Sequence, residues 1–254
     1  MKHTYGWIPN LPDQRDLLYI RRRQLRELPA AVDLRANCPP VYDQGDLGSC
    51  TANAIAAAVD FERMKQKLFV LAPPSRLFIY YNERALEGTT ASDAGASLRD
   101  GFKTIATQGV CQEKHWPYNP AMFATEPNKD CYVAALAHKT IKYLSVAQSQ
   151  TDMLDCLANG YPFVFGITVY DSFESDAVNA SGNVPMPGPN EGVLGGHALL
   201  AVGYSLAYSP AIARIRFRNS WGTSWGDAGY GTIPIQYLTN PDLASDFWTI
   251  RLEE

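Results

Sequence analysis

The order of helix-like and strand-like sequence along the chain limits its fold more than any other feature. Alanine-rich or amphipathic stretches predict helices over 50–64, 75–87 and 96–107, all in the first half. Runs rich in β-branched and aromatic residues predict strands in the second half, at 163–169, 198–203, 214–218, 230–235 and 247–250. Because helices precede strands instead of alternating with them, we expect an α+β protein with two lobes and not a parallel α/β sheet.

Composition disfavours several classes of protein. The 254 residues are 46% hydrophobic and 19% charged, which is typical of a chain that buries a sizeable core. A formal net charge of -4 disfavours a protein that coats nucleic acid. No apolar run approaches the roughly 20 residues that span a bilayer, and no apolar signal core follows the N-terminus. We therefore expect a monomer with no nucleic-acid or membrane partner, either cytoplasmic or exported without a visible signal peptide.

Residues 1–28 form an arm that differs from the rest of the chain. The arm contains Pro9 and Pro12, shows no helical period, and therefore suits an extended conformation. Six basic residues against three acidic ones give the arm a net charge of +3, so the remainder of the chain carries -7. Long-range attraction could hold such an arm on the acidic body, although a solvated linker has the same composition.

The odd number of cysteines leaves at least one thiol outside any intramolecular disulfide, and Cys50 is the candidate. It lies between a loop that contains Gly45 and Gly48 and the first predicted helix. The partial positive charge of a helix N-terminus favours thiolate, which is the nucleophilic form of cysteine. On these local features alone, a small buried cysteine that merely packs at a helix start is the commoner case.

A base for this thiol is suggested by His197, which follows two glycines and opens an apolar strand. A core histidine bonded to a backbone carbonyl is the alternative. Asn219 follows a later strand and could fix the orientation of an imidazole, with Trp221 shielding their hydrogen bond from water. A glycine-rich turn whose tryptophans pack in the core explains the same segment.

Together these segments resemble the papain-like cysteine peptidases. The family's Gln-Gly-x-Cys-Gly-Ser-Cys-Trp motif is matched by residues 44–51, which read Gln-Gly-Asp-Leu-Gly-Ser-Cys-Thr. Its histidine segment resembles residues 196–204, and its Asn-Ser-Trp-Gly motif resembles residues 219–222. The order Cys, His, Asn is the family's, and the 147 residues between the cysteine and the histidine fall in its range. Lesser matches lie at 28–35 and 109–118.

The resemblance implies a papain-like two-lobe fold, with the arm at 1–28 and a peptidase domain at 29–254. The active site would lie in the cleft between a helical N-terminal lobe and a β-rich C-terminal lobe. The resemblance also implies that Cys50 attacks a peptide carbonyl, with His197 as acid and base and Asn219 orienting the imidazole.

Further site residues follow from the same resemblance. The side-chain amide of Gln44 and the backbone N–H of Cys50 would form the oxyanion hole, and Trp221 would border the primed side. The substrate-binding wall would contain Gly95, Ala96 and Leu98. No cofactor and no metal is implied, and the cysteines and histidines lack paired zinc-ligand spacing.

Three positions depart from the family pattern. Leu47 replaces the cysteine that normally anchors the nucleophile loop, so other contacts must hold this loop. Thr51 replaces the tryptophan that follows the nucleophile, so packing below the helix start must differ. Ala96 replaces a glycine and narrows the third subsite, and Leu98 near the second subsite predicts a modest preference for an apolar P2 residue. The short arm and the missing disulfide cysteine favour a bacterial form.

The remaining cysteines leave the redox state open. Cys131 roughly matches a family disulfide position whose usual partner is absent, and Cys111 is a candidate substitute. In a reducing compartment these two, together with Cys38 and Cys156, could all be free.

We expect a cysteine endopeptidase that acts on a protein or peptide substrate through an acyl-enzyme. We also hypothesise that residues 1–28 occlude the cleft and that their cleavage activates a zymogen. The alternatives are an exopeptidase or an acyltransferase with the same Cys-His-Asn site, and a non-catalytic papain-like binding protein.

Overall fold

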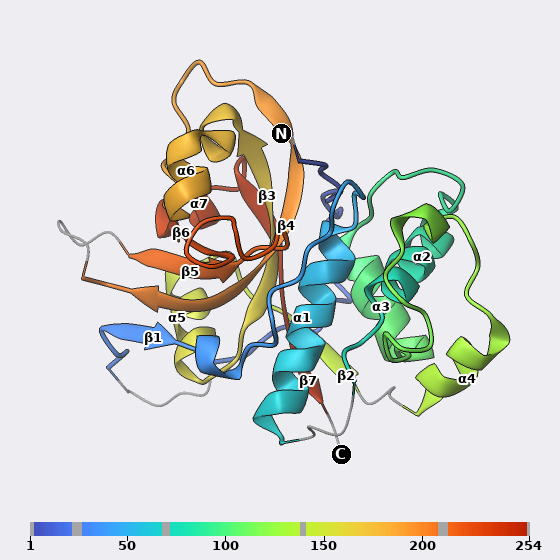
Figure 1. The fold of residues 1–254 in the computed structure, drawn as a ribbon. Coiled ribbons are helices and arrows are strands. Elements are labelled where there is room, and N and C mark those ends of the chain that lie inside the picture. Colours follow the sequence, from blue (N-terminus) through green and yellow to red (C-terminus); the bar gives the residue numbers. More distant parts are fainter. Residues whose placement is uncertain (1–2, 22–26, 68–71, 138–140, 208–212, 253–254) are drawn as a thin grey trace.

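Two lobes lie side by side in the computed structural model of the chain, one helical and one rich in strands (Figure 1). The structure describes residues 3–21, 27–67, 72–137, 141–207 and 213–252. Helices dominate the first half of the sequence and strands the second half, so the α+β architecture with two lobes is confirmed.

The helical lobe is organised around α1, which runs along the boundary between the lobes (Figure 1). Its alanine-rich sequence lets neighbouring elements approach closely, and 14 of its 16 residues are buried. It packs against α2 and α3 on one side and against β4 and β7 on the other. The helices of this lobe are α1 (Cys50–Lys65), α2 (Arg76–Glu87), α3 (Leu98–Gln108) and α4 (Lys129–Leu136).

Capping residues determine where these helices begin and end. The side chain of Ser75 accepts a hydrogen bond from the backbone N–H of Phe78, and Ser97 does the same for Asp100. Gly88 ends α2 in the left-handed conformation at φ 72°, which glycine adopts without steric cost. The observed bounds therefore differ from the predicted ones by only one or two residues.

The β-rich lobe contains a seven-stranded antiparallel sheet with the order β2-β7-β3-β4-β5-β6, and β1 pairs with β4. The strands are β1 (Ala31–Asp33), β2 (Ile141–Ser145), β3 (Phe163–Tyr170), β4 (Val193–Ser205), β5 (Arg214–Arg218), β6 (Tyr230–Pro234) and β7 (Ala244–Leu252). Shorter helices accompany them, namely α5 (Gln150–Ala158), α6 (Asp176–Ser181) and α7 (Ile235–Thr239). Single 3₁₀ turns lie at 35–37, 120–122 and 171–174.

Three features of the sheet differ from the sequence-based expectations. The short strands β1 and β2 were not predicted, because each is specified by its distant partner, β4 or β7, and not by its own composition. His197 lies inside β4 and does not open it, since the strand already begins at Val193. The glycines before His197 therefore belong to the sheet.

The five cysteines are all free thiols, so the pairing of Cys111 with Cys131 is not formed. Burial and the neighbouring Cys131 raise the pKa of Cys111 to about 12. Within the part of the chain that the structure describes, no helix is both long and apolar enough to cross a bilayer.

Candidate active site

Cys50 begins α1 and is fully buried at the boundary between the lobes. Burial raises the pKa of its thiol to about 12, although hydrogen bonds from the backbone N–H groups of Ala198 and Gly6 act in the opposite direction. Ala198 directly follows His197 on β4. The thiol of the helical lobe therefore lies close to the strand of the β-rich lobe that carries the imidazole.

The imidazole of His197 is held by one defined hydrogen bond. Its Nε2 lies 2.8 Å from Oδ1 of Asn219, the residue that follows β5. Nδ1 is buried and has no hydrogen-bond partner. Trp221 stacks on the ring at 4.7 Å between centroids and an interplanar angle of 29°, which keeps water from the bond between His197 and Asn219. Burial lowers the pKa of His197 to about 4, so the ring is neutral at pH 7.

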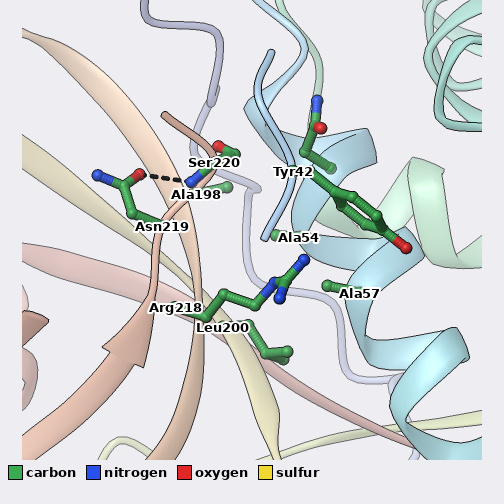
Figure 2. Close-up of a pocket in the computed structure, with 9 residues that line it drawn as sticks. Tyr42, Ala54, Ala57, Ala198, Leu200, Arg218, Asn219 and Ser220 are labelled. Carbon is green, nitrogen blue, oxygen red and sulfur yellow. Dashed lines mark hydrogen bonds between the residues drawn. The ribbon is translucent and has the colours of Figure 1, made fainter. Parts of the chain in front are cut away.

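Arg218 fixes the position from which Asn219 projects. Its guanidinium donates to the backbone oxygens of Pro39 and Pro40 and lies 4.7 Å from the centroid of the Tyr42 ring. Figure 2 shows this guanidinium beside Tyr42, next to a cavity of about 10 Å³ between α1, the middle of β4 and the end of β5. A cavity of that size holds about one water molecule, so the support behind Asn219 is nearly close-packed.

Gln44 is oriented by the segment that carries Asn219. Its Oε1 accepts a hydrogen bond from the hydroxyl of Ser220 at 2.6 Å. Its Nε2 donates to the backbone oxygens of Leu47 at 2.9 Å and of Thr4 at 3.1 Å. The amide nitrogen of Gln44 therefore donates both to its own loop and to a carbonyl oxygen that the N-terminal arm supplies.

The nucleophile loop is held without a disulfide. The backbone N–H of Gly48 donates to the carboxylate of Asp93 at 3.0 and 3.1 Å, and the hydroxyl of Tyr80 donates to the same carboxylate. Leu47, at the position of the family cysteine, is buried in the core of the helical lobe. These contacts are the alternative anchors that the substitution at position 47 required.

The packing below the start of α1 also differs from the family pattern. The hydroxyl of Thr51 donates to Oε1 of Glu83 at 2.6 Å, and both side chains are fully buried. Oε2 of Glu83 has no partner. A Cβ on Gly101 would lie 2.6 Å from this oxygen, so glycine is required there to make room for the carboxyl group.

The N-terminal arm crosses this site between the two lobes. The backbone N–H groups of Gly6 and Trp7 donate to the oxygen of Gly196 on β4, at 3.1 and 2.9 Å. On the other side, Ala96 donates to the oxygen of Gly6 at 2.7 Å and accepts from Ile8 at 3.0 Å. Residues 6–8 therefore lie as an added strand between the β-rich lobe and the helical lobe.

The arm's N-terminal end is anchored over Trp221. The ring of His3 stacks on Trp221 at 3.7 Å with an interplanar angle of 1°. Nδ1 of His3 lies 2.9 Å from a carboxylate oxygen of Glu174, and the hydroxyl of Tyr5 donates to the same carboxylate. Burial alone would raise the pKa of Glu174, but the hydrogen bonds from His3 and Tyr5 lower it overall.

Most residues predicted from the sequence converge on one place. The structure brings Cys50, His197, Gln44 and Trp221 against the arm, and Asn219 is bonded to His197. Gly95 and Ala96 lie on the opposite side of the arm. Leu98 is fully buried in the core cluster that also contains Trp7.

Sequence reasoning missed several contacts of the arm and of Gln44. Ser220 was included only as part of a motif, although its hydroxyl orients Gln44. Glu174 and Asp246 were not singled out, because each lies in a segment without a recognisable motif. Among the described residues, no group of three or more His, Cys, Asp or Glu side chains could hold a metal ion.

Comparisons with known proteins agree with this geometry. The family model described as "Papain family cysteine protease" matches residues 28–245. An uncharacterized peptidase C1-like protein of Acanthamoeba polyphaga mimivirus is 39% identical, over 99% of this chain and 88% of that protein.

Solved structures with the same fold include one bacterial enzyme and one plant enzyme. Xylellain, a cysteine protease from Xylella fastidiosa, is 42% identical with a TM-score of 0.90, over 100% of this chain and 97% of that one. The bromelain protease from Ananas comosus, in complex with the E64 inhibitor, is 21% identical with a TM-score of 0.63, over 89% of this chain and 100% of that one. Because the family model matches most of this chain and a peptidase C1-like relative is 39% identical over 99% of it, this chain belongs to the papain family of cysteine proteases.

Proposed function

We propose that the chain is an endopeptidase in which Cys50 is the nucleophile and His197 is the general acid and base. The observation that carries this proposal is the 2.8 Å contact between Nε2 of His197 and Oδ1 of Asn219. This contact occupies Nε2 and leaves Nδ1 without a hydrogen-bond partner. The next residue, Ala198, donates its backbone N–H to the thiol of Cys50. Asn219 is then the positioning residue that selects the ring orientation.

The reaction follows from these positions. The Cys50 thiolate attacks the peptide carbonyl carbon, and a tetrahedral oxyanion forms. His197 gives its proton to the leaving amine as the C–N bond breaks, which leaves a thioester on Cys50. Water attacks the thioester and His197 accepts one of its protons; the C–S bond then breaks, which releases the carboxylic acid and restores the Cys50 thiolate beside protonated His197.

Gln44 is the proposed side-chain donor to the oxyanion. Its Nε2 is already bonded to a peptide carbonyl oxygen, that of Thr4 in the arm, at 3.1 Å. A donor held in place before the reaction stabilises developing negative charge without reorganising. The hydroxyl of Ser220 supplies that restraint through its hydrogen bond to Oε1.

The docked arm accounts for an inactive resting state. It buries the reacting pair, and burial raises the pKa of Cys50 to about 12 and lowers that of His197 to about 4. Both groups are then neutral at pH 7, and a neutral thiol is a poor nucleophile. We therefore infer that residues 1–28 are a latency segment that precedes a peptidase domain at 29–254.

The direction of the arm explains why it can occupy the site without being cut. Its N-terminal end stacks on Trp221, on the side assigned to residues after the scissile bond. Its later residues pair with Ala96, on the wall assigned to residues before that bond. A substrate would run the other way, so the carbonyl of Thr4 is not presented as a substrate carbonyl.

Full-length protein can test both parts of the proposal. A Cβ on Gly6 would lie 1.7 Å from the backbone oxygen of Gly48, so the substitution Gly6→Ala expels the arm without removing it. We expect Gly6→Ala to hydrolyse peptides and to bind E64 on Cys50, and the natural sequence to do both at least about tenfold more slowly.

Two controls make this experiment specific. Leu11→Ala changes an arm residue that is 84% exposed and should leave the resting state unchanged. Cys50→Ala in the Gly6→Ala protein should abolish hydrolysis and labelling. An inactive Gly6→Ala protein with a natural melting profile would reject the peptidase assignment, and equal rates for Gly6→Ala and the natural sequence would reject latency.

A further inference from the structure

A second stretch of the arm, residues 16–21, docks outside the cleft, on the edge of β2. This strand is the first in the sheet order, so one of its sides is a sheet edge. The backbone N–H of Ser145 donates to the oxygen of Leu17 at 2.7 Å, and the N–H of Tyr19 donates to the oxygen of Ser145 at 2.8 Å. Leu18 thereby forms a parallel bridge with Ser145, as a peptide does when it adds to a sheet edge.

Two side chains of this segment are bound by acidic residues of α5. The hydroxyl of Tyr19 donates to Oδ2 of Asp155 at 2.7 Å, and the guanidinium of Arg251 lies 5.7 Å from the centroid of the tyrosine ring. Nε of Arg21 lies 2.9 Å from Oδ1 of Asp152. Because side chains alternate along an extended segment, residues 19 and 21 share the face that is turned to α5. The basic arm thus meets the acidic body at defined carboxylates.

The apolar side chains of the segment contribute little to this docking. Leu17, Leu18 and Ile20 are 57%, 64% and 81% exposed. Most of their surface stays in contact with solvent, so burial of apolar area is a minor part of what holds residues 16–21. Backbone pairing supplies affinity at such an edge, and the bound polar side chains supply specificity.

Arg99 of α3 holds the start of the segment. Its guanidinium donates to both carboxylate oxygens of Asp16, at 3.0 and 2.7 Å, which is a bidentate pair of defined geometry. The two side chains are only 20% and 15% exposed. The same guanidinium donates to the backbone oxygen of Leu11 at 2.7 Å, so it binds both ends of the turn that joins the two docked parts of the arm.

This turn is bonded to itself. The backbone N–H of Asp16 donates to the oxygen of Asp13 at 3.2 Å, and the guanidinium of Arg15 pairs with the Asp13 carboxylate at 2.6 Å. On one side of the turn, residues 3–10 contact β4 and the wall at Ala96, whereas residues 16–21 contact β2, α5 and α3. Segments that contact different elements can open separately.

We propose that the edge of β2 is a second peptide-binding site outside the catalytic cleft, formed together with Arg99, Asp152 and Asp155. Its ligand is an extended segment that carries a carboxylate, a phenol and a guanidinium at positions i, i+3 and i+5. Its occupant is residues 16–21 of this chain, which stay bound when residues 3–10 leave the cleft. The cleft part then re-docks from a high effective concentration, so latency is reversible. This last step rests on the proposed latency of the arm, and the binding site itself does not.

A peptide titration tests the site in trans. In the full-length protein, the combined substitutions Asp16→Ala, Tyr19→Ala and Arg21→Ala release the segment and leave the residues of the site intact. A fluorescein-labelled peptide with the sequence of residues 13–21 should bind this triple variant with saturation below about 1 mM, because a weaker site would not retain a tethered segment. The natural protein should bind the peptide at least about tenfold more weakly, because its own segment competes. Fluorescence anisotropy measures both affinities.

Matched changes show whether side chains are recognised. Tyr19→Phe in the peptide keeps its size and charge and removes the hydroxyl that Asp155 binds, so the affinity should fall about tenfold. Asp155→Ala in the triple variant should have the same effect, and Asp242→Asn, at an exposed position, should have none. The site is rejected if the triple variant shows no saturation below about 1 mM, if the natural protein binds equally well, or if the Tyr19→Phe peptide binds equally well.

Hydrogen exchange of full-length proteins tests whether the segment is retained. Gly6→Ala should raise exchange of the Ile8 amide, which is bonded to Ala96, and change exchange at Tyr19 and Ser145 by less than about threefold. Asp155→Ala should do the reverse. A large rise at all three amides in either protein would show that the arm opens as one unit, and would overturn retention.

These measurements need no peptidase activity. A Gly6→Ala protein that hydrolyses no peptide would therefore reject the proposed function while the second site stands. Failure of the peptide to bind would reject the second site and leave the proposed function intact.

Discussion

The hydroxyl of Thr51 donates a 2.6 Å hydrogen bond to the carboxyl group of Glu83, directly below the first turn of the helix that carries Cys50. Residue 51 is where the family pattern has a tryptophan, so a small polar pair takes the place of a large apolar ring. Burial raises the pKa of Glu83 well above its ordinary value. Burial thus favours the neutral form of the carboxyl group that fills this space below the nucleophile.

This burial predicts how stability depends on pH. A carboxyl group whose pKa is raised in the folded state stabilises the fold at low pH, and that contribution is lost as pH rises toward the folded pKa. Glu83→Gln keeps the acceptor for Thr51 and cannot ionise, so its melting temperature should decline less than that of the natural sequence between pH 5 and pH 9. Glu126→Gln, at an exposed position, should keep the natural decline. Parallel melting curves for Glu83→Gln and the natural protein would show that Glu83 is ionised in the fold.

The reactivity of Cys50 should depend on the arm. In the docked state burial raises the pKa of the thiol to about 12, so alkylation by iodoacetamide should stay slow from pH 6 to pH 9 and rise only in more alkaline solution. In the Gly6→Ala protein the arm no longer buries the thiol beside His197, so alkylation of Cys50 should already be rapid at pH 6. Mass spectrometry of the labelled Cys50 peptide measures both rates. The same pH profile for the two proteins would contradict the assignment of latency to the arm.

The contribution of Gln44 can be measured in the Gly6→Ala protein. Gln44→Ala removes a donor to the oxyanion and should lower kcat by about 10²–10³ with a small change in KM. Ser220→Ala removes only the hydroxyl that orients the amide and should lower kcat by a smaller factor, about tenfold. Steady-state kinetics on one peptide substrate measures both decreases in kcat and shows which is larger. A Ser220→Ala defect as large as that of Gln44→Ala would mean that Ser220 acts by another route.

The anchor at Glu174 should control release of the arm. Hydrogen bonds to a charged carboxylate contribute about 1.5–3 kcal/mol each, and Glu174 accepts from both His3 and Tyr5. Glu174→Gln should therefore label with E64 at least about tenfold faster than the natural protein at pH 7. Asp242→Asn serves as the matched control.

The same anchor has a defined pH dependence. Because the pKa of Glu174 is lowered in the docked state, its contribution is present above its ordinary pKa and is lost as pH falls through the docked value. The difference in labelling between Glu174→Gln and the natural protein should then shrink on acidification. A difference that stays constant down to pH 3 would argue against an ionised Glu174 anchor.

Much of the candidate site could be predicted because its motifs are local. The Gln44 to Cys50 segment combines a glycine-containing loop with a helix start, and His197 and Asn219 lie in or beside apolar strands. The roles of these residues remain predictions for the experiments above, but their positions around one cleft follow from the two-lobe fold. By contrast, β1 has only three residues and gave no signal, because its pairing with β4 specifies it.

The amino-acid sequence by itself determined the fold class and the family, since helical and strand periodicity and motif spacing are properties of contiguous residues. It also indicated an arm suited to an extended conformation. Only the tertiary structure decided where that arm lies. Trp7 meets Asp246 across 239 residues of sequence, and His3 meets Glu174 across 171. Such contacts depend on sheet register and on the docking of two lobes, and these arise from the packing of the whole chain, which no local pattern encodes.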